Sequence, residues 1–87
     1  GNIGFFSQSG ALGTAILDWA IVRDIGFSKF ITLGNKMDID EVDILNALGD
    51  DPNTDVIVGY IEGVSNGSAF MNTAKRISLK KPVIILK

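Results

Sequence analysis

Two short stretches of the sequence place polar residues directly after apolar runs, where they could bind a ligand. The first is residues 7–11, Ser-Gln-Ser-Gly-Ala, which separate an apolar run from an amphipathic one. If a helix starts here, its unpaired backbone N–H groups and the hydroxyls of Ser7 and Ser9 would bind an anion such as phosphate. The second is Glu62-Gly63, directly after the apolar run 55–61. A carboxylate at the end of a buried strand is poorly solvated and needs a partner such as a histidine or a cation.

Simpler interpretations of both stretches remain open. Ser9 could act only as a helix N-cap, worth about 1 kcal/mol, and Glu62 could be a solvent-facing loop residue. Residues 7–11 are not a P-loop, because GxxxxGK[ST] is absent, and residues 10–13 lack the GxGxxG spacing of dinucleotide-binding turns. A serine nucleophile is least favoured here, since it would need GxSxG and a histidine; residues 7–13 do not match GxSxG and the sequence holds no histidine.

The other polar clusters have structural explanations. Gly34-Asn35 suits a tight turn, because both residue types tolerate positive φ. The acidic run 38–43 lacks the spacing of an EF-hand, and helix capping accounts for it. We therefore expect no metal site.

Composition excludes several classes of function. The 87 residues contain no Cys and no His, which excludes disulfides, zinc–thiolate sites and a Ser-His-Asp triad within them. A net charge of −2 gives no basic stripe for nucleic acid, and no apolar run reaches the roughly 18 residues of a membrane span. We expect a cytoplasmic protein that binds neither nucleic acid nor membrane. Because the chain starts and stops inside expected strands, we expect residues 1–87 to be one truncated domain.

Hydrophobic patterning predicts the elements that position these residues. Nearly continuous apolar runs predict strands buried on both faces at 2–6, 29–33, 55–61 and 82–86. Apolar residues three and four apart predict helices at 10–24, 40–48 and 67–80. The order β-α-β-α-β-α-β predicts a doubly wound parallel α/β sheet with helices on both faces. Ligands bind such sheets at the carboxyl ends of strands, where residues 7–11 and Glu62 lie.

Local signals predict helix ends and buried faces. Asp40 is expected to cap the second helix, with Asp43 three residues on, and Gly26 suits the end of the first helix. Trp19, in the middle of the first helix, is expected in the core. The apolar stripes are Leu12, Ala15, Ile16, Trp19 and Val22 in the first helix, Ile44, Leu45 and Leu48 in the second, and Phe70, Ala74 and Ile77 in the third.

Three segments, taken together, resemble one known family. They read FFSQSGALGTAILDWA, GFSKFITLGNKMDIDEVDILNALGDDPNTDVIVGYIEG and KKPVIILK. These resemble the succinyl-CoA ligase-like flavodoxin domain of NDP-forming acyl-CoA synthetases, of the type found in the α-subunit of ADP-forming acetate–CoA ligases. The resemblance covers nearly all 87 residues and implies a flavodoxin-like fold. Such enzymes interconvert acyl-CoA, ADP and phosphate with the free acid, CoA and ATP, through an acyl phosphate and a phosphohistidine.

The resemblance also implies roles for individual residues. The family's phosphate cradle falls on Ser7, Gln8, Ser9, Gly10 and Ala11. Glu62 matches the glutamate that orients the active-site histidine, and Gly34 and Asn35 match a turn near the site. In the family, the histidine lies in a Ser-His-Thr-Gly-like loop after the last strand, and these 87 residues do not include that loop.

The resemblance further implies the cofactors and partners of a parent enzyme. We expect that enzyme to use CoA, ADP or ATP, phosphate and Mg, and this fragment to bind no cofactor by itself. The expected partners are a CoA-binding domain and an ATP-grasp domain or subunit of the same enzyme, with phosphate or acyl phosphate as the small-molecule ligand.

Two alternatives come from other functional classes. Residues 7–12 also resemble the phosphate loop of a flavodoxin-like FMN module, although flavin sites use loop aromatics, whereas Trp19 is expected mid-helix and Tyr60 mid-strand. Some relatives of the ligase family lose the histidine and serve as catalytically silent regulatory domains. A histidine in the loop after the last strand would identify an enzyme, and its absence would identify a regulatory domain.

Overall fold

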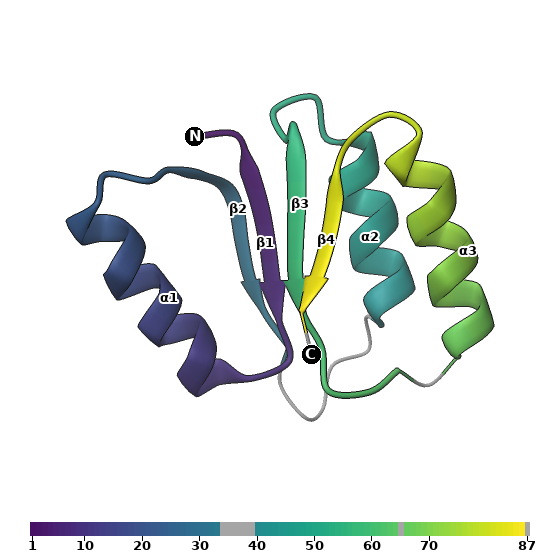
Figure 1. Cartoon of the computed structure of the whole chain (residues 1–87), viewed down its shortest axis with the longest axis horizontal. Coiled ribbons are helices and arrows are strands. Elements are labelled where there is room, and N and C mark those ends of the chain that lie inside the picture. Colours follow the sequence, from purple (N-terminus) through teal and green to yellow (C-terminus); the bar gives the residue numbers. More distant parts are fainter. Residues whose placement is uncertain (34–39, 65, 87) are drawn as a thin grey trace.

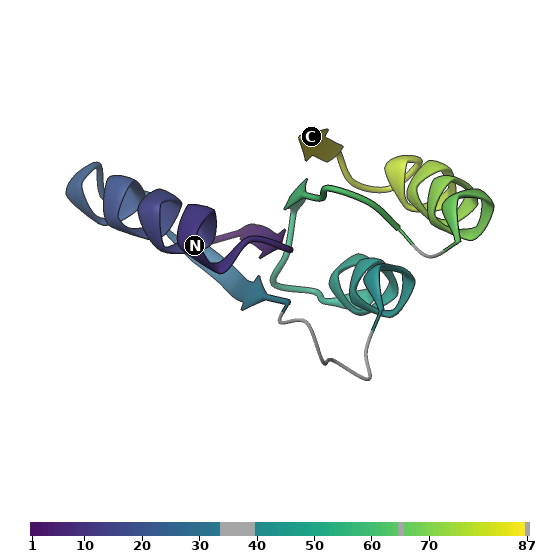
Figure 2. The ribbon, with the colours of Figure 1, turned by 90° about the horizontal axis from the view of Figure 1, so that it is seen from below.

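Four parallel strands and three helices alternate along the chain, in a computed structural model that describes residues 1–33, 40–64 and 66–86. The elements are β1 (Ile3–Ser7), α1 (Gly10–Val22), β2 (Phe27–Thr32), α2 (Glu41–Asp50), β3 (Val56–Tyr60), α3 (Gly67–Ser78) and β4 (Val83–Leu86). The strand order is β2-β1-β3-β4, with α1 on one face of the sheet and α2 and α3 on the other (Figure 1, Figure 2). The predicted flavodoxin-like, doubly wound α/β fold is confirmed.

The order of strands determines where a site can form. From β1 the chain crosses to β2 on one side, and the later crossovers return to β3 and β4 on the other side. The switch point of the sheet therefore lies between β1 and β3, which pair in parallel from Ile3↔Val56 to Ser7↔Tyr60. Because the carboxyl ends of adjacent strands diverge into opposite layers at a switch point, ligands bind there in open α/β sheets.

Alternating strand residues supply two separate apolar layers. The main core lies between the sheet and the α2–α3 pair and contains Phe6, Leu33, Ile44, Leu45, Leu48, Ile57, Ile61, Phe70 and Ile77. Phe5, next to Phe6 on β1, packs in a second group of rings, with centroids 4.9 Å from Phe30. The predicted inward faces of α2 and α3 are confirmed, since Ile44, Leu45 and Leu48 are buried, as are Phe70 and Ile77.

Gly59 allows the close contact between β3 and the Phe6 ring. A Cβ at Gly59 would lie 2.3 Å from Phe6 Cζ, and Phe6 is 0% exposed, so the ring has no free space to enter. Gly59→Ala should therefore lower the free energy of unfolding by about 1–3 kcal/mol, measured by urea denaturation of the protein that carries this chain. Gly10→Ala is the matched control, because nothing lies within 4 Å of a Cβ there. Equal losses in the two variants would contradict the packing argument.

The inward face of α1 differs from the prediction. Its buried residues are Gly13 and Ala20, whereas Trp19 is 51% exposed and Val22 is 82% exposed. Trp19 is therefore not in the core, and the Arg23 guanidinium lies 4.3 Å from its ring centroid. The expected stripe is wrong because nearly every position of α1 is apolar, so the spacing of apolar residues does not single out one face. Small residues decide the face, since they let the helix approach the sheet.

Three further predictions, about the start of a strand, the burial of the edge strands and the end of α1, are wrong. The strand expected at 29–33 begins earlier, at Phe27. The edge strands β2 and β4 are only partly buried, so the expectation of burial on both faces is wrong for them. After α1, the residue with left-handed backbone is Asp24, at φ 56°, and no described glycine has positive φ. Gly26 therefore does not end the helix.

Asp51 stabilises the loop between α2 and β3. The Asn53 amide donates to its Oδ1 at 3.0 Å, the Thr54 hydroxyl donates to its Oδ2 at 2.7 Å, and Lys29 Nζ lies 3.6 Å from Oδ2. These contacts, led by the hydrogen bond from Asn53, hold the pKa of the Asp51 carboxyl below its ordinary value. A carboxyl whose pKa is lowered by folding adds stability above its unfolded pKa of about 3.9, and this is lost as pH falls through the folded pKa.

Asp51→Asn should therefore lower stability at neutral pH and flatten the loss of stability on acidification below about pH 4. Urea unfolding at a series of pH values measures both effects. A variant that keeps the full acid dependence of the parent protein would contradict this assignment.

No helix of the described ranges is both long enough and apolar enough to cross a membrane.

Candidate functional site

The carboxyl ends of β1 and β3 bring the two sequence-predicted stretches together at the switch point. Ser7 ends β1 opposite Tyr60, and the Gln8 amide donates to Tyr60 O at 3.0 Å, one step beyond the last strand pair. The chain then turns into α1 from β1, and towards α3 from β3 (Figure 1). Residues 7–11 and Glu62 therefore lie at the same edge of the sheet.

The β1–α1 turn is held by its two serines. Ser7 is fully buried; its hydroxyl donates to Ser9 O at 2.7 Å and accepts from the Ser9 amide at 3.0 Å. Ser9 is the N-cap of α1, and its Oγ accepts from the Leu12 amide at 3.1 Å. The N-cap interpretation of Ser9 is thus confirmed. The Ser7 hydroxyl is fully engaged inside the turn, so it shapes the turn rather than facing outward.

Two backbone donors at the start of α1 have no hydrogen-bond partner among the described residues. The first i→i−4 bond of the helix is from Gly13 N to Ser9 O, and the Leu12 amide is taken by the cap. Within residues 1–33, 40–64 and 66–86, the amides of Gly10 and Ala11 make no hydrogen bond, and both residues are exposed. Unpaired N–H groups at the positive end of a helix dipole favour an anion. Capping and anion binding are therefore compatible here, because they use different amides.

Glu62 lies just beyond β3, where its backbone is held by Gln8. The amides of Glu62 and Gly63 donate to Gln8 Oε1 at 2.5 and 3.1 Å. Gln8 Nε2 donates to Gly63 O at 2.5 Å and to Glu41 Oε1 at 2.9 Å. The Glu62 side chain itself is exposed and makes no hydrogen bond to another described residue. Its solvent-facing position agrees with the simpler interpretation, and it also leaves the carboxylate free for a partner.

The N-terminus of α2 also reaches this edge. Asp40 caps the helix by accepting from the Asp43 amide at 2.9 Å, and Asp43 Oδ2 accepts from the Asp40 amide at 3.3 Å. The predicted cap is confirmed as a reciprocal capping box. Glu41, the next residue, accepts from Gln8 and so links α2 to the turn. Gly34 and Asn35, the expected near-site turn, lie outside the described residues.

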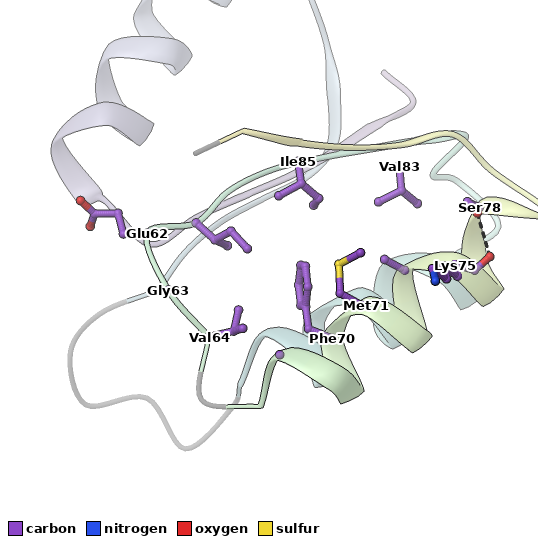
Figure 3. A pocket seen from close by; sticks show the side chains of 12 residues that line it. Glu62, Gly63, Val64, Phe70, Met71, Lys75, Ser78, Val83 and Ile85 are labelled. Atoms are coloured by element: carbon purple, nitrogen blue, oxygen red, sulfur yellow. Dashed lines mark hydrogen bonds between the residues drawn. The ribbon is translucent and has the colours of Figure 1, made fainter.

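A groove of about 700 Å³ adjoins Glu62 on the side of α3. Its walls are mostly apolar and include Val64, Phe70, Met71, Val83 and Ile85. Figure 3 shows the Glu62 side chain directed away from this groove, so its carboxylate does not line the interior. The groove follows the sheet edge formed by β4 and is separate from the α1 N-terminus.

The sequence did not predict the contacts of Gln8. It lies 54 residues from Glu62 and 33 from Glu41, so only the fold brings the three together. The one signal was a long polar side chain immediately after a buried strand. Gln8 was expected to bind phosphate, but its side-chain amide is hydrogen-bonded to other residues of the protein instead.

Comparison with known proteins yields one family model over the full chain. The model describes the succinyl-CoA ligase-like flavodoxin domain and matches residues 1–87. The chain is 48% identical over 87 residues to the alpha subunit of acetate–CoA ligase (ADP-forming) I from Pyrococcus furiosus, covering 100% of this chain and 19% of that protein. It is 44% identical over 89 residues to a 4-hydroxybutyrate–CoA ligase (ADP-forming) from Nitrosopumilus maritimus, covering 100% of this chain and 13% of that protein.

Solved structures match the fold closely. A dinucleotide-forming acetyl-coenzyme A synthetase 1 from Ca. Korarchaeum cryptofilum, in complex with phosphate and ADP, matches with a TM-score of 0.89 and 47% identity, covering 98% of this chain and 19% of that chain. A crystal structure of a Pyrococcus horikoshii protein matches with a TM-score of 0.95 and 52% identity, covering 100% and 20%. The chain thus spans a fifth or less of the length of these proteins.

Proposed function

Because the chain belongs to the family of succinyl-CoA ligase-like flavodoxin domains, we propose that it forms part of an NDP-forming acyl-CoA synthetase. In this proposal it supplies the phosphate cradle and the histidine-orienting glutamate for phosphoryl transfer between acyl phosphate and a nucleoside diphosphate. The observation that carries the proposal is the direct attachment of the Glu62 peptide to the turn that starts α1, through Gln8.

The cradle consists of residues 7–11 in their folded arrangement. The free amides of Gly10 and Ala11 point out of the α1 N-terminus, where the helix dipole favours negative charge. The Ser9 hydroxyl already accepts from Leu12, and its proton is available to a phosphate oxygen. Ser7 and Gln8 contribute by holding the turn in shape. A transferring phosphoryl group needs such preorganised donors more than covalent help.

Glu62 is proposed to orient the histidine that carries the phosphoryl group. A carboxylate that accepts from one ring nitrogen fixes the tautomer, so the other nitrogen is presented as the nucleophile. Glu62 suits this role because its carboxylate is exposed while its backbone is fixed. Gly34 and Asn35 are proposed to form a turn beside this site.

The remaining components belong to the parent enzyme. Two of the matched proteins are named as ADP-forming CoA ligases, and one solved relative holds phosphate and ADP. We propose that the parent enzyme uses CoA, ADP or ATP, phosphate and Mg, in the cytoplasm. Since the chain spans a fifth or less of its relatives, we propose that a CoA-binding domain and an ATP-grasp domain or subunit complete the site.

The test is phosphorylation of the full-length protein. Incubation with ATP labelled on its γ-phosphate should give an acid-labile, base-stable phosphoprotein, as expected for phosphohistidine. Unlabelled ADP should remove the label and return it as ATP. This assay does not depend on the identity of the acyl group. Absence of label, together with quenching of FMN fluorescence by the protein, would favour the flavin-binding alternative instead.

A further inference from the structure

The Gln8 side chain is used completely by contacts within the protein. Its Oε1 accepts from two backbone amides, those of Glu62 and Gly63, while its Nε2 donates to Gly63 O and to Glu41 Oε1. The four partners fix the orientation of the amide. A flipped side chain would place its NH₂ group against two N–H groups and its oxygen against a carbonyl and a carboxylate. Gln8 therefore has no side-chain donor left for a bound anion.

These contacts fix the segment that carries Glu62. On one side, the Ile61 amide donates to Leu86 O at 3.0 Å, continuing the ladder between β3 and β4. On the other side, the next two amides donate to Gln8. The Glu62 side chain makes no hydrogen bond to another described residue, so the direction in which its carboxylate leaves the backbone depends on the position of this peptide.

Glu41 in turn fixes Gln8. It is the first residue of α2, directly after the Asp40 cap, and its Oε1 accepts from Gln8 Nε2 at 2.9 Å. Gln8 itself is anchored by its own amide, which donates to Tyr60 O at 3.0 Å. A single amide group thus ties together the β1–α1 turn, the segment after β3, and the start of α2.

We propose that Gln8 is a positioning residue, which holds the Glu62 peptide at a fixed distance from the α1 N-terminus and thereby places the carboxylate so that the histidine it orients faces the anion held there. This role rests on the proposed function, and it assigns Gln8 to the support of Glu62 rather than to direct contact with phosphate. A displacement of about 1 Å in a reacting group can lower the rate roughly 100-fold. Loss of the four Gln8 hydrogen bonds should therefore reduce turnover more than it reduces the binding of ATP.

The experiment uses the full-length enzyme with Gln8→Leu, which keeps the side-chain volume and removes all four hydrogen bonds. Two measurements are made: amide hydrogen exchange at Glu62 and Gly63, and the kinetics of phosphoryl transfer from ATP. We expect faster exchange of both amides and a fall in kcat of roughly 10- to 100-fold, with the KM for ATP unchanged. Asn72→Leu, at an exposed amide of α3, is the control and should change neither.

A second pair of variants keeps the test valid if Gln8→Leu folds poorly. Gln8→Glu retains the acceptor for the two amides but places a second carboxylate against Glu41. Adding Glu41→Gln restores a donor and an acceptor between positions 8 and 41, so turnover should recover in part. Hydrogen exchange at Glu62 and Gly63 is measured in both variants, and turnover that recovers while these amides still exchange fast would contradict the positioning role.

The outcomes separate the two proposals. If the wild-type enzyme takes up no label from ATP, the proposed function fails, and the positioning role fails with it. If the wild-type enzyme is labelled but Gln8→Leu turns over normally, the positioning role alone is overturned. Unchanged amide hydrogen exchange at Glu62 and Gly63 in Gln8→Leu would also overturn the positioning role, because the Gln8 side chain would then not hold these amides.

Discussion

Glu62→Gln in the full-length enzyme should lower the level and rate of phosphoenzyme formation by about 100-fold or more. A neutral amide offers a donor as well as an acceptor, so it no longer selects one histidine tautomer and no longer stabilises a charged imidazole. Removal of the equivalent charge from a Ser-His-Asp triad costs about 10⁴-fold, for the same reason. Radiolabel transfer from ATP, measured at short times, checks the prediction.

The fold should not change in Glu62→Gln. The side chain is exposed, and within the described ranges it accepts no hydrogen bond that a glutamine would lose. The contacts to Gln8 use the backbone amide, which the substitution retains. Asp18→Asn, which neutralises an exposed carboxylate of α1, is the matched control and should leave phosphorylation unchanged. Phosphoenzyme formation by Glu62→Gln at the wild-type rate would show that Glu62 does not orient the histidine.

Gly10→Pro should weaken phosphoryl transfer roughly 10- to 100-fold, because it deletes one of the two free amides at the α1 N-terminus. A hydrogen bond to a charged group contributes about 1.5–3 kcal/mol, which corresponds to that range. Proline is accepted at the first position of a helix, where its missing N–H has no intrahelical partner. Single-turnover phosphorylation at several ATP concentrations measures the fall in the rate of phosphoryl transfer.

The local backbone is already suited to this substitution. Ser9 has φ −98° and ψ 117°, the extended conformation that a residue before proline requires. A Cβ at Gly10 meets no atom within 4 Å, so this carbon of the proline is accommodated. Gly10→Ala is the control, because it adds a Cβ and keeps the amide, and it should retain nearly full activity. Equal losses in the proline and alanine variants would point to backbone flexibility instead of the missing donor.

The fold could be predicted from local patterns because its elements are amphipathic or apolar in a regular way. The runs that became β1, β3 and β4 are short and rich in β-branched or aromatic residues, and α2 and α3 have apolar residues at helical spacing. The prediction was wrong for the inward face of α1, where apolar residues lie on all sides and Trp19 is exposed. Hydrophobic spacing cannot identify a packing face when the other faces are apolar too.

For the candidate site, local patterns were enough to predict which residues end the strands and which begin the helices. Residues 7–11 and Glu62 were identifiable because the chemistry of a helix N-terminus and of a carboxylate after a buried strand is local. The four hydrogen bonds of Gln8, in contrast, depend on the tertiary structure. The physical reason is that a hydrogen bond requires its donor and acceptor to be about 3 Å apart. Sequence spacing says nothing about that distance for residues 54 positions apart until the order of β1 and β3 in the sheet places them side by side.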